Sequence, residues 1–210
     1  SRMGPLSELL ILVLAGWTSG ISVYLTAAIL GIGSRAGWVE LPGALKTLDH
    51  PLLIGLAVLL YAVEFIADKV PFVDSAWDSV HTFIRPAAAG MGGYLAGSEM
   101  GPLVQTGLAM MTGTIALDAH AVKASTRLAI NTSPEPFSNI AASVAEDSFV
   151  VFLFWFFVQH PILACLAVAV LLVLSYFILR LLWKFVRGVF RLLTGASGPK
   201  PAPAAPRLNP

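Results

Sequence analysis

The stretch MGPLVQTGLAMMTGTIALDAHAVKASTR, residues 100–127, begins as an apolar helix and ends in charged groups. No charged side chain occurs before Asp118, and His120, Lys123 and Arg127 follow within about three helical turns. The spacings of three and four place His120, Lys123 and Arg127 on one helix face, whereas Asp118 points elsewhere. A buried charge without a partner is costly, so these side chains require partners, a function or both.

The composition is that of a membrane protein. Of 210 residues, 57% are hydrophobic and 12% are charged, and the mean hydropathy is +0.80. Soluble domains carry roughly 25% charged residues. The formal net charge of +1 gives no basic field that would favour a nucleic acid. The lipid bilayer is therefore the expected partner.

Apolar runs long enough to cross a bilayer, about 20 residues each, predict an all-α polytopic membrane protein of about six helical segments. They are residues 6–32, 51–67, 74–96, 102–127, 140–158 and 161–189. The first contains GWTSG, residues 16–20, where we expect the helix to be interrupted. The third begins with an amphipathic stretch, 74–86, that fits a span, a re-entrant hairpin or an interfacial helix.

The two ends of the chain differ in character. The beginning resembles a signal peptide, but its apolar run is too long for one, and we expect a retained first helix. Pro, Ala and Gly dominate the end of the chain, which is typical of disorder. The chain thus divides into a transmembrane domain, residues 1–191, and a disordered tail, residues 192–210.

A shift of about 92 residues relates the two halves, because LTAAILGIGSRAGWVELP (25–42) falls on LDAHAVKASTRLAINTSP (117–134). Three helices in each of two repeats, 6–97 and 101–189, would invert the second repeat, as in transporters with broken or re-entrant helices. Six spans place both termini on one side of the membrane. The cationic end of the last segment predicts that this side is cytoplasmic; its side chains are Arg180, Lys184, Arg187 and Arg191.

Carboxylates also interrupt the apolar segments. Glu64 and Asp68 share a helix face with Tyr61, and Glu146 and Asp147 lie about two turns inside the fifth segment. An ionisable group inside a bilayer is costly and is usually paired or functional. A further stripe at spacings of four, three and four consists of Asp74, Asp78, His81 and Arg85.

Two interpretations of these charges stay open, structural ion pairs and a transport pathway built from such pairs. In the second, carboxylates and imidazoles carry protons or cations, while Lys123 and Arg127 balance their charge or attract an anion. The candidate transport or ion-binding residues are Glu64, Asp68, Asp78, His81, Arg85, Asp118, His120, Lys123, Arg127, Glu146 and Asp147.

No catalytic signature is present, since the sequence holds no G-x-S-x-G, no P-loop and no pair of cysteines. Asp and His side chains are potential metal ligands, but no compact ligand motif such as H-E-x-x-H occurs, so the sequence leaves a metal site undetermined. We expect no cofactor and no catalytic residues.

Residues 62–90 resemble a known family. The run E-F-x-A-D-K-x-P-x-x-D-x-x-W-D, followed by H-x-x-x-R-P, is similar to a bacterial membrane family known as domain of unknown function 4126. AHAVKASTR and NTSPEPFSN resemble the second half of that family. The resemblance covers roughly residues 9–179 and implies a multi-pass protein of the bacterial inner membrane. It implies no activity, so no functional residue is carried over from it.

The sequence thus favours a small transporter or channel for an ion or small polar solute, with proton coupling and with charged residues between two helical repeats. Two alternatives are a membrane-embedded enzyme that acts on lipid and an assembly protein without transport. A homodimer is compatible with this size, and nothing in the sequence fixes it.

Overall fold

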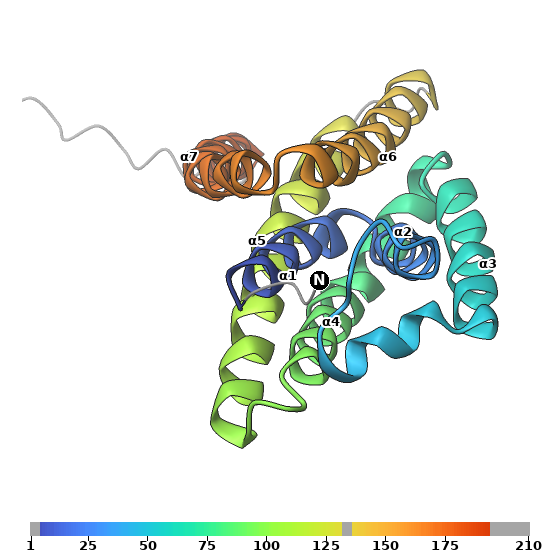
Figure 1. The fold of residues 1–210 in the computed structure, drawn as a ribbon. Coiled ribbons are helices and arrows are strands. Elements are labelled where there is room, and N and C mark those ends of the chain that lie inside the picture. Colours follow the sequence, from blue (N-terminus) through green and yellow to red (C-terminus); the bar gives the residue numbers. More distant parts are fainter. Residues whose placement is uncertain (1–4, 132–135, 194–210) are drawn as a thin grey trace, which may run out of the picture.

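The computed structural model describes residues 5–131 and 136–193, and the regular secondary structure in this part of the chain is all helical. Each of the helices α3 to α7 begins with proline, which suits the first helical position because an N–H there has no partner within the helix. The elements are α1 (Pro5–Ile21), α2 (Val23–Arg35), the 3₁₀ helix η1 (Gly43–Asp49), α3 (Pro51–Ala67), α4 (Pro71–Ala96), α5 (Pro102–Ile130), α6 (Pro136–Gln159) and α7 (Pro161–Leu193) (Figure 1).

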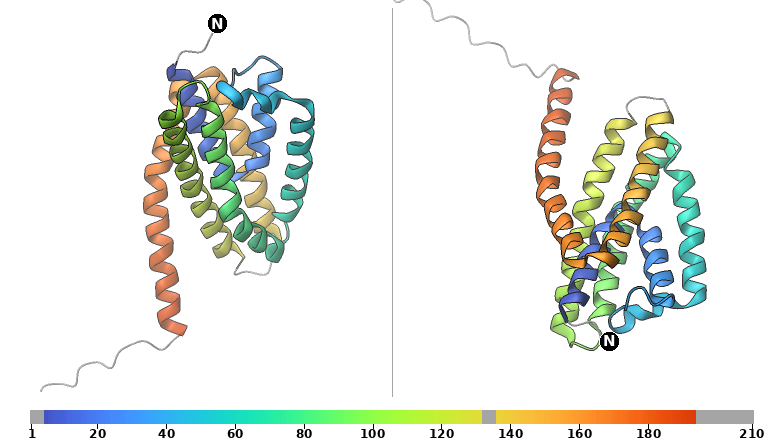
Figure 2. Two further views of the ribbon diagram at one scale, coloured as in Figure 1. Left: turned by 90° about the horizontal axis from the view of Figure 1, so that it is seen from below. Right: turned by 45° about the horizontal axis from the view of Figure 1, so that its top comes forward.

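The first predicted segment is broken, but at Ser22 and not within GWTSG. Ser22 has φ −149° and ψ 99°, an extended conformation between α1 and α2. Gly20 remains helical, and its missing side chain allows α1 to pack closely on α5. A Cβ at Gly20 would lie 2.6 Å from Cβ of Ala119 on α5. Figure 2 shows that α1 enters the bundle from one end and that α2 turns back toward the same end. The break therefore lies deep among the other helices.

The remaining α-helices run antiparallel to their neighbours in the chain, from α3 to α7 (Figure 2). The third predicted segment is one continuous helix, α4, with Pro86 inside it, and not a re-entrant hairpin. It packs closely on α5 through small residues: a Cβ at Gly93 would lie 2.5 Å from the carbonyl oxygen of Leu108, and one at Gly113 would lie 3.2 Å from that of Pro86. The pair of helices that turns back within the bundle is thus α1 and α2.

The start of α1 and the end of α7 lie at opposite ends of the molecule (Figure 2). This arrangement differs from the predicted one, in which six spans return both termini to one side. The physical reason is the break at Ser22, since α2 leads the chain back to the end where α1 began. Most of the predicted tail, residues 194–210, lies outside the described residues.

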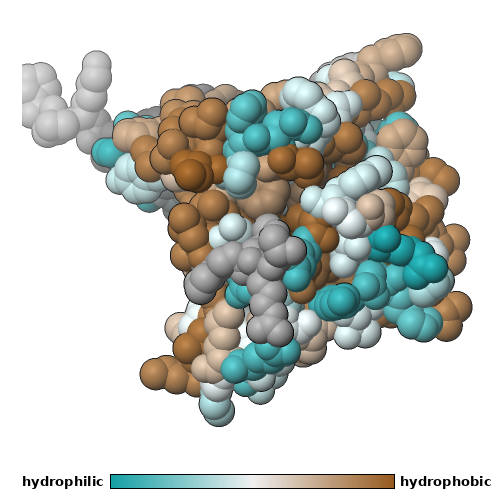
Figure 3. Space-filling model, viewed as in Figure 1, coloured by the Kyte–Doolittle hydropathy of each residue, from teal (hydrophilic) through white to brown (hydrophobic). Residues whose placement is uncertain are grey.

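Two described helices, α6 and α7, are long and apolar enough to cross a membrane, and η1 with α3 would be a third span bent by 72°. Apolar side chains cover much of the surface, with Phe72 and Leu103 both 87% exposed. Figure 3 views the end that holds η1, where hydrophilic side chains gather over η1 and hydrophobic ones surround them. These findings support a membrane protein with two to three such helices.

Candidate functional site

The polar stripes predicted from the sequence meet inside the bundle. Four helices contribute, and their spacings of three and four residues bring each stripe to one face. Arg85 is 0% exposed, and Arg127 and Glu64 are each 1% exposed. We call the residues that form ion pairs there the charge network: Glu64 and Asp68 at the end of α3, Asp74, Asp78 and Arg85 on α4, Lys123 and Arg127 on α5, and Glu146 on α6.

Arg85 organises the half of the network that lies beside the helix break. Its Nη2 donates to Oε1 of Glu64 at 2.8 Å, and its Nη1 donates to Oδ1 of Asp78 at 3.1 Å. The other oxygen of Glu64 accepts a hydrogen bond of 2.6 Å from Oγ of Ser22. Glu64 is therefore held between a cation on α4 and the first residue of the turn into α2.

His120 adds a neutral partner to Arg85. Nη1 of Arg85 lies 2.7 Å from Nδ1 of His120. Because a guanidinium only donates, Nδ1 must accept and carries no proton. The ring proton then sits on Nε2, which lies 3.0 Å from Oγ1 of Thr82 and 3.2 Å from the carbonyl oxygen of Asp78. In this arrangement His120 is a neutral imidazole and positions Arg85.

Lys123 and Arg127 organise the other half of the network. Nζ of Lys123 donates to Oδ2 of Asp68 at 2.8 Å. Arg127 makes a two-pronged contact with Glu146, at 3.1 Å from Nε and 2.7 Å from Nη2. Its Nη1 donates to Oδ1 of Asn139 at 2.7 Å, and Nδ2 of Asn139 in turn donates to the carbonyl oxygen of Asp68 at 2.9 Å. This half joins the ends of α3 and α5 to the start of α6.

The end of α1 and the start of α2, which meet at the break, each face side chains of the opposite charge. The last carbonyls of a helix have no partner within it and carry a partial negative charge. Here the carbonyl oxygen of Ile21 accepts from Nζ of Lys123 at 3.0 Å, and that of Gly20 accepts from Nη1 of Arg85 at 3.4 Å. The positive end of α2, which starts after Ser22, faces the carboxylate of Glu64. Cations thus meet the end of α1, and an anion meets the start of α2.

The charge network contains more acids than bases. Five carboxylates form ion pairs with three cations, which leaves an excess of two negative charges if every group is ionised. Within the described residues, three of its buried carboxylate oxygens have no hydrogen-bond partner: Asp68 Oδ1, Asp74 Oδ1 and Asp78 Oδ2. Oδ1 of Asp74 does lie 3.8 Å from Nη1 of Arg127. An added proton or cation would therefore reduce the negative charge of the network and provide a partner for these oxygens.

Besides His120, three further predicted site residues lie outside these ion pairs. His81 stacks on Trp77 with ring centroids 4.5 Å apart, and its Nε2 lies 3.2 Å from the hydroxyl of Tyr24. Asp118 forms no ion pair among the described residues, and its buried Oδ2 has no hydrogen-bond partner there. Asp147 accepts a hydrogen bond of 2.9 Å from Tyr61, which the sequence placed with Glu64.

Lys69 lies in the turn between α3 and α4, where Nζ donates to the carbonyl oxygen of Phe65 at 2.9 Å and lies 3.4 Å from Oγ of Ser143. Burial of the ammonium lowers the pKa of Lys69, and the nearby carboxylates of Asp147 and Asp68 oppose this shift. Lys69 therefore lies beside the network and bonds to neutral groups.

The sequence did not reveal several polar residues that complete the site. Ser22 was part of an apolar run, and its only signal is that it is a hydroxyl at the end of a helix-breaking stretch. Asn139 lies in the first turn of α6 and is 0% exposed. Asn131 donates to Oδ2 of Asp74 at 2.7 Å. Uncharged side chains such as these show no periodic pattern, so only the packing of the helices identifies them.

The fold and the network define a class: an all-α protein with helices apolar enough to span a membrane and with charged groups buried between helices. The chain belongs to the family described as Domain of unknown function (DUF4126), which matches residues 9–181. This match confirms the resemblance noted from the sequence, and it covers every helix of the charge network. No curated protein and no solved structure matches the chain.

Proposed function

We propose that this protein is a small transporter for an ion or small polar solute, with its binding site at the break between α1 and α2. The observation that carries the proposal is the break itself, deep in the bundle, with Glu64 at the start of α2 and with Arg85 and Lys123 at the end of α1. Secondary transporters place substrate sites at such discontinuous helices, because the exposed helix ends supply partial charges at membrane depth.

The excess of two carboxylates supports protons or cations as the coupled species. Carboxylate oxygens without a partner are sites where a proton or cation gains the contacts that are otherwise missing. Glu64 is our first candidate for this role, because it lies at the break and joins α3 to both α2 and α4. Lys123 and Arg127 would balance the remaining charge.

A cavity of about 240 Å³ between α4 and α5 supports access to the network. Asp78 and Arg127 line it together with four hydroxyl side chains, a lining that suits a small polar solute. The hydroxyl residues are Ser75, Ser79, Thr82 and Ser125.

The orientation that we propose places the end of α7 in the cytoplasm, because Arg180, Lys184 and Arg187 occur there and cationic ends face inward. The turn between α3 and α4 lies at the same end of the bundle. The start of α1 would then face outward. This orientation revises the expectation that both termini are cytoplasmic, and the bacterial inner membrane is the compartment that we propose.

A second candidate is an assembly protein whose network is structural. One observation favours it: each of the three buried cations already contacts at least two oxygens, as Arg127 does with Glu146 and Asn139. A fully paired network would hold the helices together without moving an ion. Flux measurements separate the two candidates.

The test is reconstitution of the full chain in liposomes, with proton and ion fluxes measured under defined gradients. Glu64→Gln keeps the size of the side chain and removes the charge, so we expect a selective flux in the natural protein and its loss in this variant. Glu99→Gln is the matched control, because Glu99 is exposed in the turn between α4 and α5. Wild-type flux in Glu64→Gln would refute the role of Glu64. No flux from folded, inserted protein would favour the assembly protein.

A further inference from the structure

A groove separates α3 from α6 and lies outside the charge network. Its cavity has a volume of about 580 Å³. The lining is mainly apolar and aromatic, with Phe65 from α3 and Phe152 and Trp155 from α6. Phe152 is 47% exposed and Trp155 is 58% exposed, so the groove opens to the side of the bundle. Molecules in the surrounding bilayer can reach it laterally.

Asp147 places a carboxylate in this groove. It lies 11 residues after the start of α6, about 16 Å along a helix that is apolar enough to span a membrane. The Tyr61 hydroxyl donates to its Oδ2 at 2.9 Å, and within the described residues Asp147 belongs to no ion pair. A charge at this depth is costly unless a partner compensates it. Lys69 is close enough for the Asp147 carboxylate to raise its pKa, but Nζ of Lys69 donates to the carbonyl oxygen of Phe65 and forms no ion pair with Asp147. The only direct partner of Asp147 among the described residues is the Tyr61 hydroxyl, so a cation in the groove would supply the ion pair that the carboxylate lacks.

The rings beside Asp147 suit a cation with an apolar body. The ring centroids of Phe152 and Trp155 lie 5.9 Å apart, and those of Tyr61 and Phe65 also lie 5.9 Å apart. Aromatic faces attract organic cations through the ring quadrupole, most strongly where water is excluded. Nζ of Lys69, which does not line the groove, already lies over the ring of Phe65.

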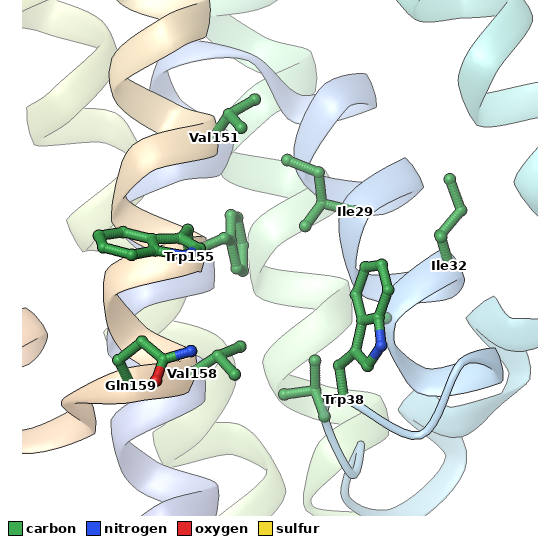
Figure 4. Close-up of a pocket in the computed structure, with 10 residues that line it drawn as sticks. Ile29, Ile32, Trp38, Val151, Trp155, Val158 and Gln159 are labelled. Atoms are coloured by element: carbon green, nitrogen blue, oxygen red, sulfur yellow. The ribbon is translucent and has the colours of Figure 1, made fainter.

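The groove continues along α6 into an apolar cavity of about 480 Å³, because Val151 and Trp155 line both. Figure 4 shows this second cavity, with Trp155, Val158 and Gln159 of α6 on one side and Ile29 and Trp38 on the other. The combined space has a carboxylate at one end and mainly apolar walls along the rest. Its shape and charge fit an amphipathic molecule with a cationic head.

We propose that this groove binds a hydrophobic organic cation, with the positive group at the Asp147 carboxylate and the apolar body along Trp155 toward Trp38. A single half-buried carboxylate among aromatic rings complements one positive charge and repels an anion of the same shape. The site shares no residue with the charge network, so binding there does not depend on the proposed transport.

Tetraphenylphosphonium is the probe, measured by equilibrium dialysis against the purified full chain in dodecyl maltoside micelles, with empty micelles subtracted. Tetraphenylborate has the same shape and the opposite charge. We expect saturable binding of the cation and none of the anion. Asp147→Asn, which keeps the acceptor for Tyr61, should weaken binding at least about tenfold, while Asp147→Glu should retain it. Asp118→Asn is the matched control and should bind as the natural protein does.

Equal binding of the phosphonium to Asp147→Asn and to the natural protein would overturn the proposal. So would saturable binding of the borate to the same groove, which would identify a purely apolar site filled by lipid chains. Glu64→Gln should leave phosphonium binding unchanged, and circular dichroism checks that each variant is folded. Loss of flux with binding retained, or the reverse, therefore distinguishes failure of one proposal from failure of the other.

Discussion

Replacement of Arg85 by methionine tests the energetics of the charge network most directly. The side chain is 0% exposed and its guanidinium bonds to Glu64, Asp78 and His120. Methionine fills a similar volume and supplies no donor. The variant therefore leaves two carboxylates buried together with no cation between them, in a network that already has more acids than bases.

The size of the effect follows from the contacts. Removal of one partner from a buried ion pair costs about 3–5 kcal/mol, because the remaining charge stays buried. Glu64→Gln keeps an acceptor for Arg85 and exchanges a charge-assisted hydrogen bond for a neutral one, at a cost of about 1 kcal/mol. In the double variant, the uncharged amide that replaces the Glu64 carboxylate removes one of the stranded charges. We expect the double variant to lose about 2 kcal/mol less unfolding free energy than the two single variants lose together.

Unfolding by SDS in mixed micelles, followed by tryptophan fluorescence, measures these differences in free energy. Arg35→Met is the matched control, since Arg35 is exposed and only its Nη1 contacts a backbone oxygen, that of Asp49, at 3.5 Å. Two results would refute the reasoning. One is an Arg85→Met protein as stable as the control variant, and the other is strict additivity in the double variant.

Three further predictions concern the break and the orientation. Gly20→Ala should destabilise the protein by about 1–3 kcal/mol in the same SDS assay, because the new Cβ meets α5, whereas Gly107→Ala, with open space, should not; equal effects would contradict the close packing. Ser22→Ala should cost about 1.5–3 kcal/mol through the lost bond to a carboxylate, and an unchanged SDS midpoint would argue against it. With Cys165 replaced by alanine, Glu99→Cys and Arg187→Cys should react with impermeant maleimide from opposite sides of the membrane; labelling from one side would exclude the proposed orientation.

The helices could be predicted from the sequence because the sequence patterns that mark them are local. The prediction of residues 51–67 agrees with α3, and the predicted segments 102–127 and 161–189 lie inside α5 and α7. Proline at helix starts and runs of apolar residues fix these bounds. An interruption of the first segment was also predicted, but within GWTSG. The glycines of that stretch pack against α5, and the interruption lies at Ser22. The repeats 6–97 and 101–189 stay a prediction.

The candidate site could be predicted from the sequence only in part. Helical spacing correctly grouped Asp78 with Arg85, and His120 with Lys123 and Arg127, because residues three and four apart share a face whatever the tertiary structure. Spacing could not say which carboxylate meets which cation, since this depends on the register between helices. It also placed Tyr61 with Glu64, whereas the hydroxyl reaches across to Asp147 on α6.

The sequence by itself determined that this chain is an apolar, helical protein of its family and that its charges lie in stripes on particular helix faces, because composition and periodicity are properties of neighbouring residues. Only the tertiary structure decided that α2 turns back at Ser22, that Glu64 meets the start of α2 while Arg85 and Lys123 meet the end of α1, and that Asp147 faces a groove. These features depend on contacts between residues far apart in the chain, and the cost of burying a charge is settled only when those contacts form.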